Sequence, residues 1–330
     1  MGEPTGEQAL GPSAGPRPRE ERETLSSDPT SMPPSARAEM GGDPLVGQLV
    51  DARYHVGPVL ADGGMGTVYE ALDVHADARV ALKTLQPRFS ERPRVVQRFE
   101  REAQALEAAR SPHVVDVIAH GRLEDARPYY VMERLDGEPL SDVIERTAAP
   151  LEPRRVVRLG VQIARGLTHA HDLGIVHRDL KPENIFLCDA VGDAPHVKLL
   201  DFGLAKAVDG STDVTKAGEL LGTPSYMAPE QIRGDRVDGR TDIYAFGVML
   251  YEMLTGRVPF EGDAAVDVMV AHVEQTPTLP SQLDPPIQLP VMLEWIAMCC
   301  LYKQPVRRFQ STHELLDELL NAARLYRVQV

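Results

Sequence analysis

The spacing of hydrophobic residues divides most of the chain into a strand-rich part and a helical part. Between about Leu45 and Met132, short runs rich in β-branched and aromatic residues predict strands. These runs lie at 54–56, 66–71, 79–85, 114–118 and 129–132. Residues 94–109 instead carry apolar side chains at helical spacing, which predicts one helix among the strands. The apolar positions are Val95, Phe99, Ala103 and Leu106.

The part that follows Gly137 carries apolar residues at positions i, i+3 and i+4 and is predicted to be mainly helical. The predicted helices span 153–173, 241–255, 264–273, 291–301 and 311–325. A small sheet-based lobe and a larger helical lobe, with a cleft between them, are typical of an α+β arrangement. We expect the small lobe to cover residues 45–132 and the larger lobe residues 133–325.

Residues 1–44 differ from the rest in composition. They are rich in Gly, Pro, Ser, Glu and Arg and contain almost no aromatic or β-branched residues. Such a segment buries too little apolar surface to offset its conformational entropy, so a disordered tail is predicted. A solvated tail and a regulatory or docking arm both fit this composition. The candidate sites in such an arm are Ser26, Ser27, Thr30 and Ser31.

Composition and charge exclude several classes of protein. Of the 330 residues, 43% are hydrophobic and 25% are charged, as in an ordinary soluble globular protein. The net charge of −14 argues against nucleic acid or an anionic membrane surface as the main partner, because both need a basic footprint. No apolar run reaches the roughly 18 residues of a membrane span, so no membrane insertion is expected. The three cysteines have no metal-type spacing, which favours reduced thiols and a cytoplasmic location.

A glycine-rich loop, residues 60–68, precedes a predicted strand and is a candidate phosphate-binding segment. Its glycines Gly63, Gly64 and Gly66 would let backbone N–H groups approach a polyphosphate without an intervening Cβ. Taken alone, such a segment is more often a plain β-turn. The loop therefore indicates phosphate binding only in combination with the residues that follow it.

Lys83 ends the sequence Val80-Ala81-Leu82-Lys83, a pattern in which the lysine contacts the α and β phosphates of a nucleotide. This lysine is expected to pair with a glutamate on the next helix. Glu102 is favoured because it lies beside the apolar stripe of that helix. Glu100 and Glu107 are the alternatives, and each is also explained as a solvated helix charge.

Residues 177–184, His-Arg-Asp-Leu-Lys-Pro-Glu-Asn, followed by Asp201-Phe202-Gly203, carry the most specific chemical signal. Asp179 is the candidate base that orients an attacking hydroxyl and accepts its proton. Asn184 and Asp201 offer the hard oxygen ligands that suit Mg²⁺. Lys181 supplies a compact positive charge for a phosphoryl group in transit. Together these residues predict phosphoryl transfer from a magnesium-bound nucleotide.

These motifs, with those at 198–205 and 222–230, resemble the bacterial Hanks-type (eukaryotic-like) serine/threonine protein kinases over about residues 54–320. The resemblance implies a bilobal protein-kinase fold, with a small antiparallel β-sheet N-lobe that contains one main helix and a larger, mainly α-helical C-lobe. It also implies that ATP binds between the lobes together with Mg²⁺, or with Mn²⁺ in its place. Residues 133–135 would then be the hinge that touches adenine, and Met132 before them would be the gatekeeper. The nucleotide-binding positions are then Leu60, Gly63, Gly64, Gly66, Val68, Ala81, Lys83, Glu102, Met132, Glu133, Leu135 and Asp201.

One position departs from the family pattern. The first glycine of the loop falls on Ala61, whose extra methyl group restricts φ. We therefore expect a stiffer loop or weaker nucleotide binding, without loss of the chemistry.

Outside the chemistry, the resemblance implies structural roles for four residues. Glu230 is expected to form a buried ion pair with Arg308, for which Arg307 is the alternative. Asp242 is expected to bond to the backbone of residues 177–184, called the catalytic loop below, and His177 to support that loop without any proton chemistry. Loss of these residues would disturb the fold or loop order before the chemistry.

The preference for serine or threonine follows from Lys181 and from Thr223 before Pro224, where tyrosine kinases usually differ. Protein substrates carrying these hydroxyls are the expected partners, because the Ala228-Pro229-Glu230 segment is absent from small-molecule phosphotransferases that share the fold.

Arg178 precedes the candidate base, so the family resemblance implies that it captures a phosphate on the activation loop, between Gly203 and Gly222. The candidate acceptors are Ser211, Thr212 and Thr215, with Thr215 favoured by position. A transient homodimer would allow one copy to phosphorylate another. The alternative is that these are ordinary polar loop residues.

Two other functions stay open at this point. A pseudokinase would bind nucleotide or partners without transferring phosphate, and Ala61 is the one feature that favours it. Lys83, Asp179, Asn184 and Asp201 are all present, however, and catalysis of this class rests on such groups. A scaffold that docks partners through residues 1–44 is compatible with an active kinase.

Overall fold

The computed structural model describes residues 43–189, 195–202 and 224–330. Residues Leu45–Val330 form one compact unit, separate from the residues before them. The predicted tail lies almost wholly outside the described residues.

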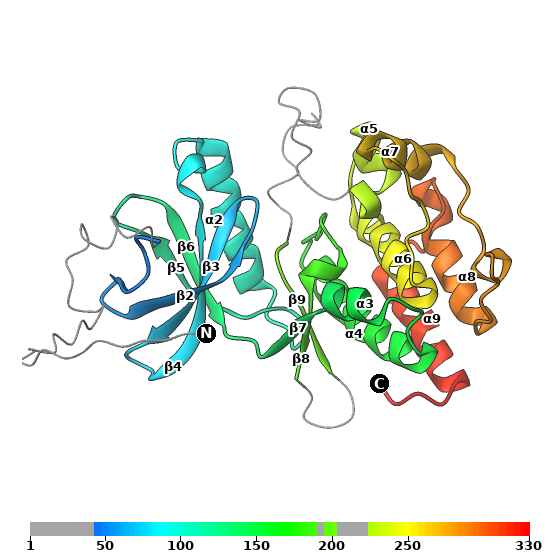
Figure 1. The fold of residues 1–330 in the computed structure, drawn as a ribbon, viewed down its shortest axis with the longest axis horizontal. Coiled ribbons are helices and arrows are strands. Elements are labelled where there is room, and N and C mark those ends of the chain that lie inside the picture. Colours follow the sequence, from blue (N-terminus) through cyan, green and yellow to red (C-terminus); the bar gives the residue numbers. More distant parts are fainter. Residues whose placement is uncertain (1–42, 190–194, 203–223) are drawn as a thin grey trace, which may run out of the picture. The chain divides into compact units, whose positions relative to one another are not determined.

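The N-terminal lobe is built on a six-stranded antiparallel sheet with the strand order β1-β2-β3-β4-β6-β5 (Figure 1). The strands are β1 (Leu49–Val50), β2 (Tyr54–Asp62), β3 (Gly66–Asp73), β4 (Ala78–Leu85), β5 (Val117–Arg122) and β6 (Pro128–Glu133). Inward-facing apolar side chains from β2, β3, β4 and β6 form a core beneath this sheet, among them Val56, Leu82 and Val131. On β4 and β6 the opposite face is buried as well, since Leu85 and Tyr130 belong to a second core cluster that also contains Phe99, Ala103 and Leu106.

Helix α2 (Pro93–Ala108) packs on β5 and β6. Its buried face carries Phe99, Ala103 and Leu106, and it also buries the polar side chain of Glu102. The ring of Phe99 lies 5.2 Å from that of Tyr130 on β6. The predicted apolar stripe therefore anchors the helix and brings its one buried carboxylate towards the sheet.

The predicted strand at 114–118 has the wrong bounds, since β5 begins only at Val117. Val114 and Val115 are buried, but they contact the other lobe: the Val115 N–H donates to the Leu199 carbonyl at 3.0 Å. Val114 and Leu199 also form a parallel β-bridge. Their apolar character reflects this connection, which hydrophobic spacing alone could not distinguish from sheet pairing.

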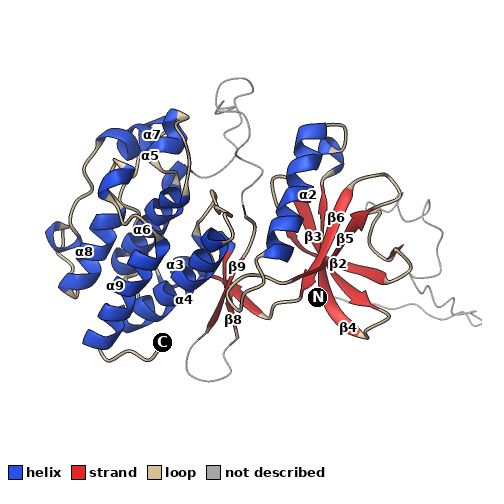
Figure 2. Ribbon diagram, turned by 180° about the vertical axis from the view of Figure 1, so that it is seen from behind, coloured by secondary structure: helices blue, strands red, loops and turns tan. Residues whose placement is uncertain are grey.

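The C-terminal lobe contains a small sheet and a set of helices (Figure 2). The sheet has the order β7-β8-β9, from β7 (Gly137–Pro139), β8 (Ile185–Cys188) and β9 (His196–Leu199). The helices are α3 (Leu140–Thr147), α4 (Pro153–Asp172), α5 (Pro229–Arg233), α6 (Gly239–Thr255), α7 (Ala265–Glu274), α8 (Val291–Cys300) and α9 (Thr312–Leu325). The α+β fold class is thereby confirmed, whereas α3, α5 and the small sheet were not predicted from the hydrophobic pattern.

Helix α6 is the centre of the C-terminal lobe. It packs against α4, α8 and α9, and nearly all its side chains are buried, which is typical of a core helix. The side chain of Asp238 caps its first turn by accepting a hydrogen bond from the Arg240 N–H. Gly256 ends the helix at φ 75°, a left-handed conformation that favours glycine. No helix in the described ranges is long and apolar enough to cross a membrane.

An ion pair at the outer end of β3 predicts how stability depends on pH. Arg53 donates to both carboxylate oxygens of Asp73, at 2.7–3.0 Å, and lowers the pKa of that carboxyl to about 2 despite partial burial. Because the folded-state pKa lies below the ordinary value of 3.8, this contact stabilises the fold above about pH 4. Its contribution is lost as the pH falls towards 2.

We therefore expect Asp73→Asn to be less stable than the unmodified chain at pH 6 and to approach it in stability near pH 2. Urea denaturation across this range measures the difference. Asp77→Asn, at an exposed position in the same turn, is the matched control and should show no such convergence. A constant difference for Asp73→Asn between pH 6 and 2 would argue against the assigned role.

Candidate active site

Lys83 joins the two lobes through a pair of carboxylates. On β4, its Nζ lies 3.1 Å from Glu102 Oε1 on α2 and 2.6 Å from Asp201 Oδ1. Tyr130 also donates to Glu102, at 3.1 Å. The other two candidate glutamates are occupied elsewhere, since Glu100 pairs with Arg122 and Glu107 lies 3.6 Å from His120. Of the three glutamates considered, the structure brings Glu102 to the lysine.

Electrostatics favour the ionised forms of Lys83 and Asp201. Burial opposes the charge on Lys83, but Asp201 and Glu102 outweigh it and hold the pKa of the lysine well above its ordinary value. Burial likewise opposes ionisation of Asp201, and the charge and hydrogen bond of Lys83 reverse this and lower the pKa. For Glu102, burial dominates and raises the pKa. The site thus holds a permanent cation beside a carboxylate that stays charged.

The catalytic loop brings Asp179, Lys181 and Asn184 together. Lys181 Nζ lies 3.9 Å from Asp179 Oδ2. Asn184 Nδ2 donates to the Asp179 carbonyl at 2.8 Å, and the Asn184 carbonyl accepts from the Leu200 N–H at 2.9 Å. This last bond links the loop to the residue just before Asp201. Hydrogen bonds therefore connect the catalytic loop to the segment that runs from β9 to Asp201.

The donor set fits a divalent cation. The amide nitrogen of Asn184 is used within the loop, which orients its oxygen Oδ1 as the remaining ligand atom. The Asp201 side chain is ionised and keeps 44% of its surface exposed. One carboxylate and one amide oxygen are hard ligands of the kind that Mg²⁺ and Mn²⁺ take, and neither ion is preferred by this pair alone.

Asp242, at the start of α6, holds the backbone of the catalytic loop. Its carboxylate accepts from the N–H of His177 at 2.7 Å and from the N–H of Arg178 at 2.8 Å. The predicted bond from Asp242 to the loop is confirmed. Arg178 has φ 66°, an unfavourable conformation for a residue with a side chain, and these two bonds help to hold it.

His171 is a residue of this network that sequence reasoning missed. Its Nε2 lies 2.7 Å from Asp242 Oδ2, so α4 also contributes to orienting the carboxylate. Burial opposes ionisation of Asp242, but the bonds and charges led by His171 lower its pKa. His177 Nε2 contacts the Leu200 carbonyl at 2.9 Å, and burial lowers the pKa of this histidine. A neutral, packed His177 supports the loop as expected.

The residues of the predicted hinge make several contacts within the protein. Met132 pairs with Ala81 across β4 and β6, which places these two candidate nucleotide-binding residues side by side. The side chain of Glu133, however, accepts from Lys198 Nζ at 2.6 Å and from the Asp116 N–H at 2.8 Å. Its carboxylate is therefore committed to the protein, so a contact with adenine would have to come from its backbone. Leu135 follows, and its carbonyl accepts from Arg134.

The glycine-rich loop forms the hairpin between β2 and β3. Ala61 pairs with Val68 in this hairpin, and Leu60 is exposed. Ala61 has an ordinary negative φ, so its methyl group causes no backbone strain. At Gly66, by contrast, a side chain would not fit, since a Cβ at this position would lie 2.8 Å from the Thr84 carbonyl oxygen. The expectation of a weakened loop at Ala61 therefore has no support in the backbone conformation.

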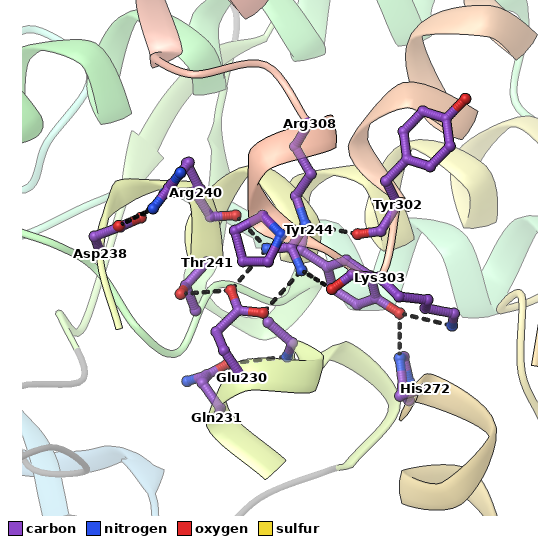
Figure 3. A network of polar contacts seen from close by, with 12 residues as sticks. Glu230, Gln231, Asp238, Arg240, Thr241, Tyr244, His272, Tyr302, Lys303 and Arg308 are labelled. Carbon is purple, nitrogen blue, oxygen red and sulfur yellow. Dashed lines mark hydrogen bonds and ion pairs between the residues drawn. The ribbon is translucent and has the colours of Figure 1, made fainter. Parts of the chain in front are cut away.

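The predicted buried ion pair between Glu230 and Arg308 is confirmed (Figure 3). Arg308 donates to the two carboxylate oxygens at 2.6 and 2.8 Å, and its side chain is fully buried. It also donates to the carbonyls of Arg240 and Lys303. Arg307, the alternative partner, is exposed and stacks on Tyr302, so that alternative is wrong.

The candidate regulatory residues Ser211, Thr212, Thr215 and Thr223 lie outside the described residues. Arg178 is described: its carbonyl accepts from Gln231 Nε2 at 2.8 Å, which ties the loop to α5. Its role in binding a phosphate stays a prediction.

Comparison with known proteins identifies the family. Residues 54–323 match the protein kinase domain, and the chain belongs to this family. More narrowly, the relatives place it among the bacterial serine/threonine kinases of Hanks type, as the motifs indicated. The fold agrees, since the crystal structure of the Mycobacterium tuberculosis PknI kinase domain aligns with a TM-score of 0.63 at 26% identity, covering 83% of this chain and 97% of that one.

Three relatives illustrate the likeness. The chain is 38% identical to "Serine/threonine-protein kinase pkn3" of Myxococcus xanthus, in an alignment that covers 84% of this chain and 51% of pkn3. It is 42% identical to Pkn1 of the same organism, over 86% of this chain and 40% of that one. It is 38% identical to PknB of Mycobacterium leprae, over 81% and 42% respectively. The chain thus spans about half or less of the length of these relatives.

Proposed function

We propose that this chain is a protein serine/threonine kinase that transfers the γ-phosphate of ATP, bound with Mg²⁺, to hydroxyl groups of protein substrates. The observation that carries the proposal is the bridge from Lys83 to both Glu102 and Asp201. A nucleotide-binding cation and a metal-binding carboxylate are thereby held in one place. The names of the relatives, all serine/threonine-protein kinases, support the choice of acceptor.

Each residue of the site has a proposed task. Lys83 binds the α and β phosphates, and Glu102 keeps its ammonium group in position. Asn184 and Asp201 hold the divalent ion, for which Mn²⁺ is the alternative. When bound, this ion neutralises charge on the phosphate oxygens. The hinge residues Glu133 and Leu135 hold the adenine through their backbone.

The acceptor side of the site consists of Asp179 and Lys181. Asp179 orients the substrate hydroxyl and takes its proton as the new phosphate ester bond forms, while the bond from the γ-phosphorus to ADP breaks. Lys181, whose ammonium group lies 3.9 Å from that carboxylate, balances charge on the group being transferred. Catalysis then depends mainly on positioning and electrostatics.

Transfer of labelled phosphate tests this proposal. The chain is incubated with ATP labelled at the γ position, Mg²⁺ and a generic protein acceptor, beside the variant Asp179→Asn. We expect label on the acceptor, reduced about 100- to 10,000-fold by the substitution, the usual contribution of a general base. Equal labelling by both proteins would show that the chemistry does not come from this site and would favour the pseudokinase alternative. A cytoplasmic location and a transient homodimer stay predictions.

A further inference from the structure

The glycine-rich loop is held by two residues that lie outside it. Gln86 and Arg88 follow directly after β4, in the connection to α2. Gln86 Nε2 donates to the Gly63 carbonyl at 2.8 Å, and the Gln86 backbone N–H donates to the Met65 carbonyl at 2.9 Å. Arg88 donates to the Gly64 carbonyl at 2.8 Å. Three consecutive carbonyls at the tip of the loop are therefore bonded from one side.

The side chain of Asp62 extends this arrangement to the base of the loop. Its Oδ1 accepts from Gln86 Nε2 at 2.9 Å and from Thr67 Oγ1 at 2.9 Å. Thr67 lies opposite Asp62 in the β2–β3 hairpin. One carboxylate oxygen thus links both strands of the hairpin to Gln86. We call Gln86 and Arg88 the loop clamp.

The geometry of the peptide bond gives the clamp a consequence for ligand binding. In a trans peptide the C=O and the following N–H point in opposite directions. Fixing the carbonyls of residues 63, 64 and 65 towards the clamp therefore turns the N–H groups of Gly64, Met65 and Gly66 to the other side. Successive N–H groups that face one way form a binding surface for anions.

The loop lies next to the phosphate-binding lysine. A Cβ added to Gly66 would lie 3.6 Å from Cε of Lys83, so the end of the loop is in contact distance of this side chain. The clamped N–H groups and the Lys83 ammonium thus belong to one region. A loop that is ordered before binding loses less conformational entropy when a phosphate chain binds.

We propose that Gln86 and Arg88 are positioning residues that order the glycine-rich loop for the phosphate groups of the nucleotide. The inference rests on the proposed function for the identity of the ligand. It explains how a loop with Ala61 at the first glycine position keeps a defined shape, because the tip is fixed by the clamp and by the turn bond from the Gly63 N–H to the Gly66 carbonyl. Neither residue touches the reacting atoms.

Binding measurements without turnover test the clamp. The variants Gln86→Ala and Arg88→Ala are titrated by calorimetry with the non-hydrolysable ATP analogue adenylyl imidodiphosphate in Mg²⁺, and separately with adenosine. Each variant loses one side-chain hydrogen bond to a carbonyl of the loop tip and should bind the analogue about two- to tenfold more weakly, the range for one exposed hydrogen bond. The bond from the Gln86 backbone N–H to the Met65 carbonyl stays in both variants. Adenosine has no phosphates, so its affinity should stay unchanged. Arg88→Lys keeps a donor and the charge and should recover part of the loss.

Two matched controls separate the clamp from general effects. Arg92→Ala removes a cation that also stacks on Phe89, at 5.4 Å compared with 4.9 Å for Arg88. Gln104→Ala removes an exposed glutamine on α2. Both controls should bind the analogue as tightly as the unmodified chain. Hydrogen exchange of the unliganded proteins should show faster exchange at 62–66 in the clamp variants alone.

The binding and hydrogen-exchange results together decide whether the loop clamp orders the loop for phosphate groups. Unchanged affinity for the analogue in both clamp variants, or an equal loss for adenosine, would overturn the inference. Hydrogen exchange at 62–66 that matches the unmodified chain would do the same. Because no step requires phosphate transfer, a chain that binds the analogue through the clamp and yet labels no acceptor would contradict the proposed function and leave the clamp intact.

Discussion

Replacing Lys83 with methionine is expected to lower the rate of phosphate transfer at least about a hundredfold, the effect typical of removing one preorganised charge from a catalytic site. The substitution removes the cation that joins Glu102 to Asp201, at 3.1 and 2.6 Å. Glu102, with 8% of its side chain exposed, is then left without its ionic partner. Steady-state rates with saturating acceptor, at several ATP concentrations, measure the loss.

Arg79→Met is the matched control for this prediction. Arg79 lies on the same strand as Lys83 and is also a long cation, but 76% of its side chain is exposed and its closest carboxylate, on Glu70, is 3.7 Å away. This variant should transfer phosphate at the unmodified rate. A fully active Lys83→Met protein would contradict the role given to the lysine, and far-ultraviolet circular dichroism would establish that the inactive variant is folded.

Replacing Arg308 with alanine is expected to reduce the free energy of unfolding by about 3–5 kcal/mol, because it leaves Glu230 buried without its partner. The side chains of Arg308 and Glu230 have 0% and 4% of their surface exposed. The substitution also removes the hydrogen bonds that Arg308 donates to the carbonyls of Tyr302, Lys303 and Arg240 (Figure 3). Urea denaturation followed by circular dichroism measures the change.

The neighbouring Arg307 provides the comparison. It is exposed, stacks on the ring of Tyr302, and forms no ion pair within the described residues. Arg307→Ala should therefore change stability by less than about 0.5 kcal/mol, as is usual for surface substitutions. Equal effects of the two substitutions would show that the buried pair does not stabilise this lobe.

The chemical motifs could be assigned from sequence because each is short and carries its own residue types. Asp179, Lys181 and Asn184 lie within six residues of one another, so any fold of this segment keeps them close. The partner of Lys83 was a choice among three glutamates, and the apolar stripe of α2 favoured the one that the structure places there. Periodicity was sufficient at this position because only one of the three carboxylates faces the sheet.

Contacts between residues far apart in the chain could not be read in this way. The strands β8 and β9 are four residues each, too short for a clear alternation of apolar and polar positions. The bonds of Glu133 to Lys198 and of His171 to Asp242 join residues separated by 65 and 71 positions. No local pattern encodes such pairs, since they depend on how the elements pack.

The structure shows what the departure from the family pattern at Ala61 means for the glycine-rich loop. The sequence suggests a stiffer or weaker loop, because alanine restricts φ where the family has glycine. In the folded chain Ala61 is a strand residue that needs no such freedom. The residues that shape the loop are Gln86 and Arg88, which lie more than 20 positions further along the chain.

The central claim is that this site phosphorylates serine or threonine in proteins. It is tested most directly by identifying the labelled amino acids after acid hydrolysis of an acceptor protein incubated with the chain, γ-labelled ATP and Mg²⁺. We expect label in phosphoserine and phosphothreonine, and almost none when Asp179→Asn replaces the unmodified chain. Label in phosphotyrosine alone, or the same labelled residues with both proteins, would contradict it.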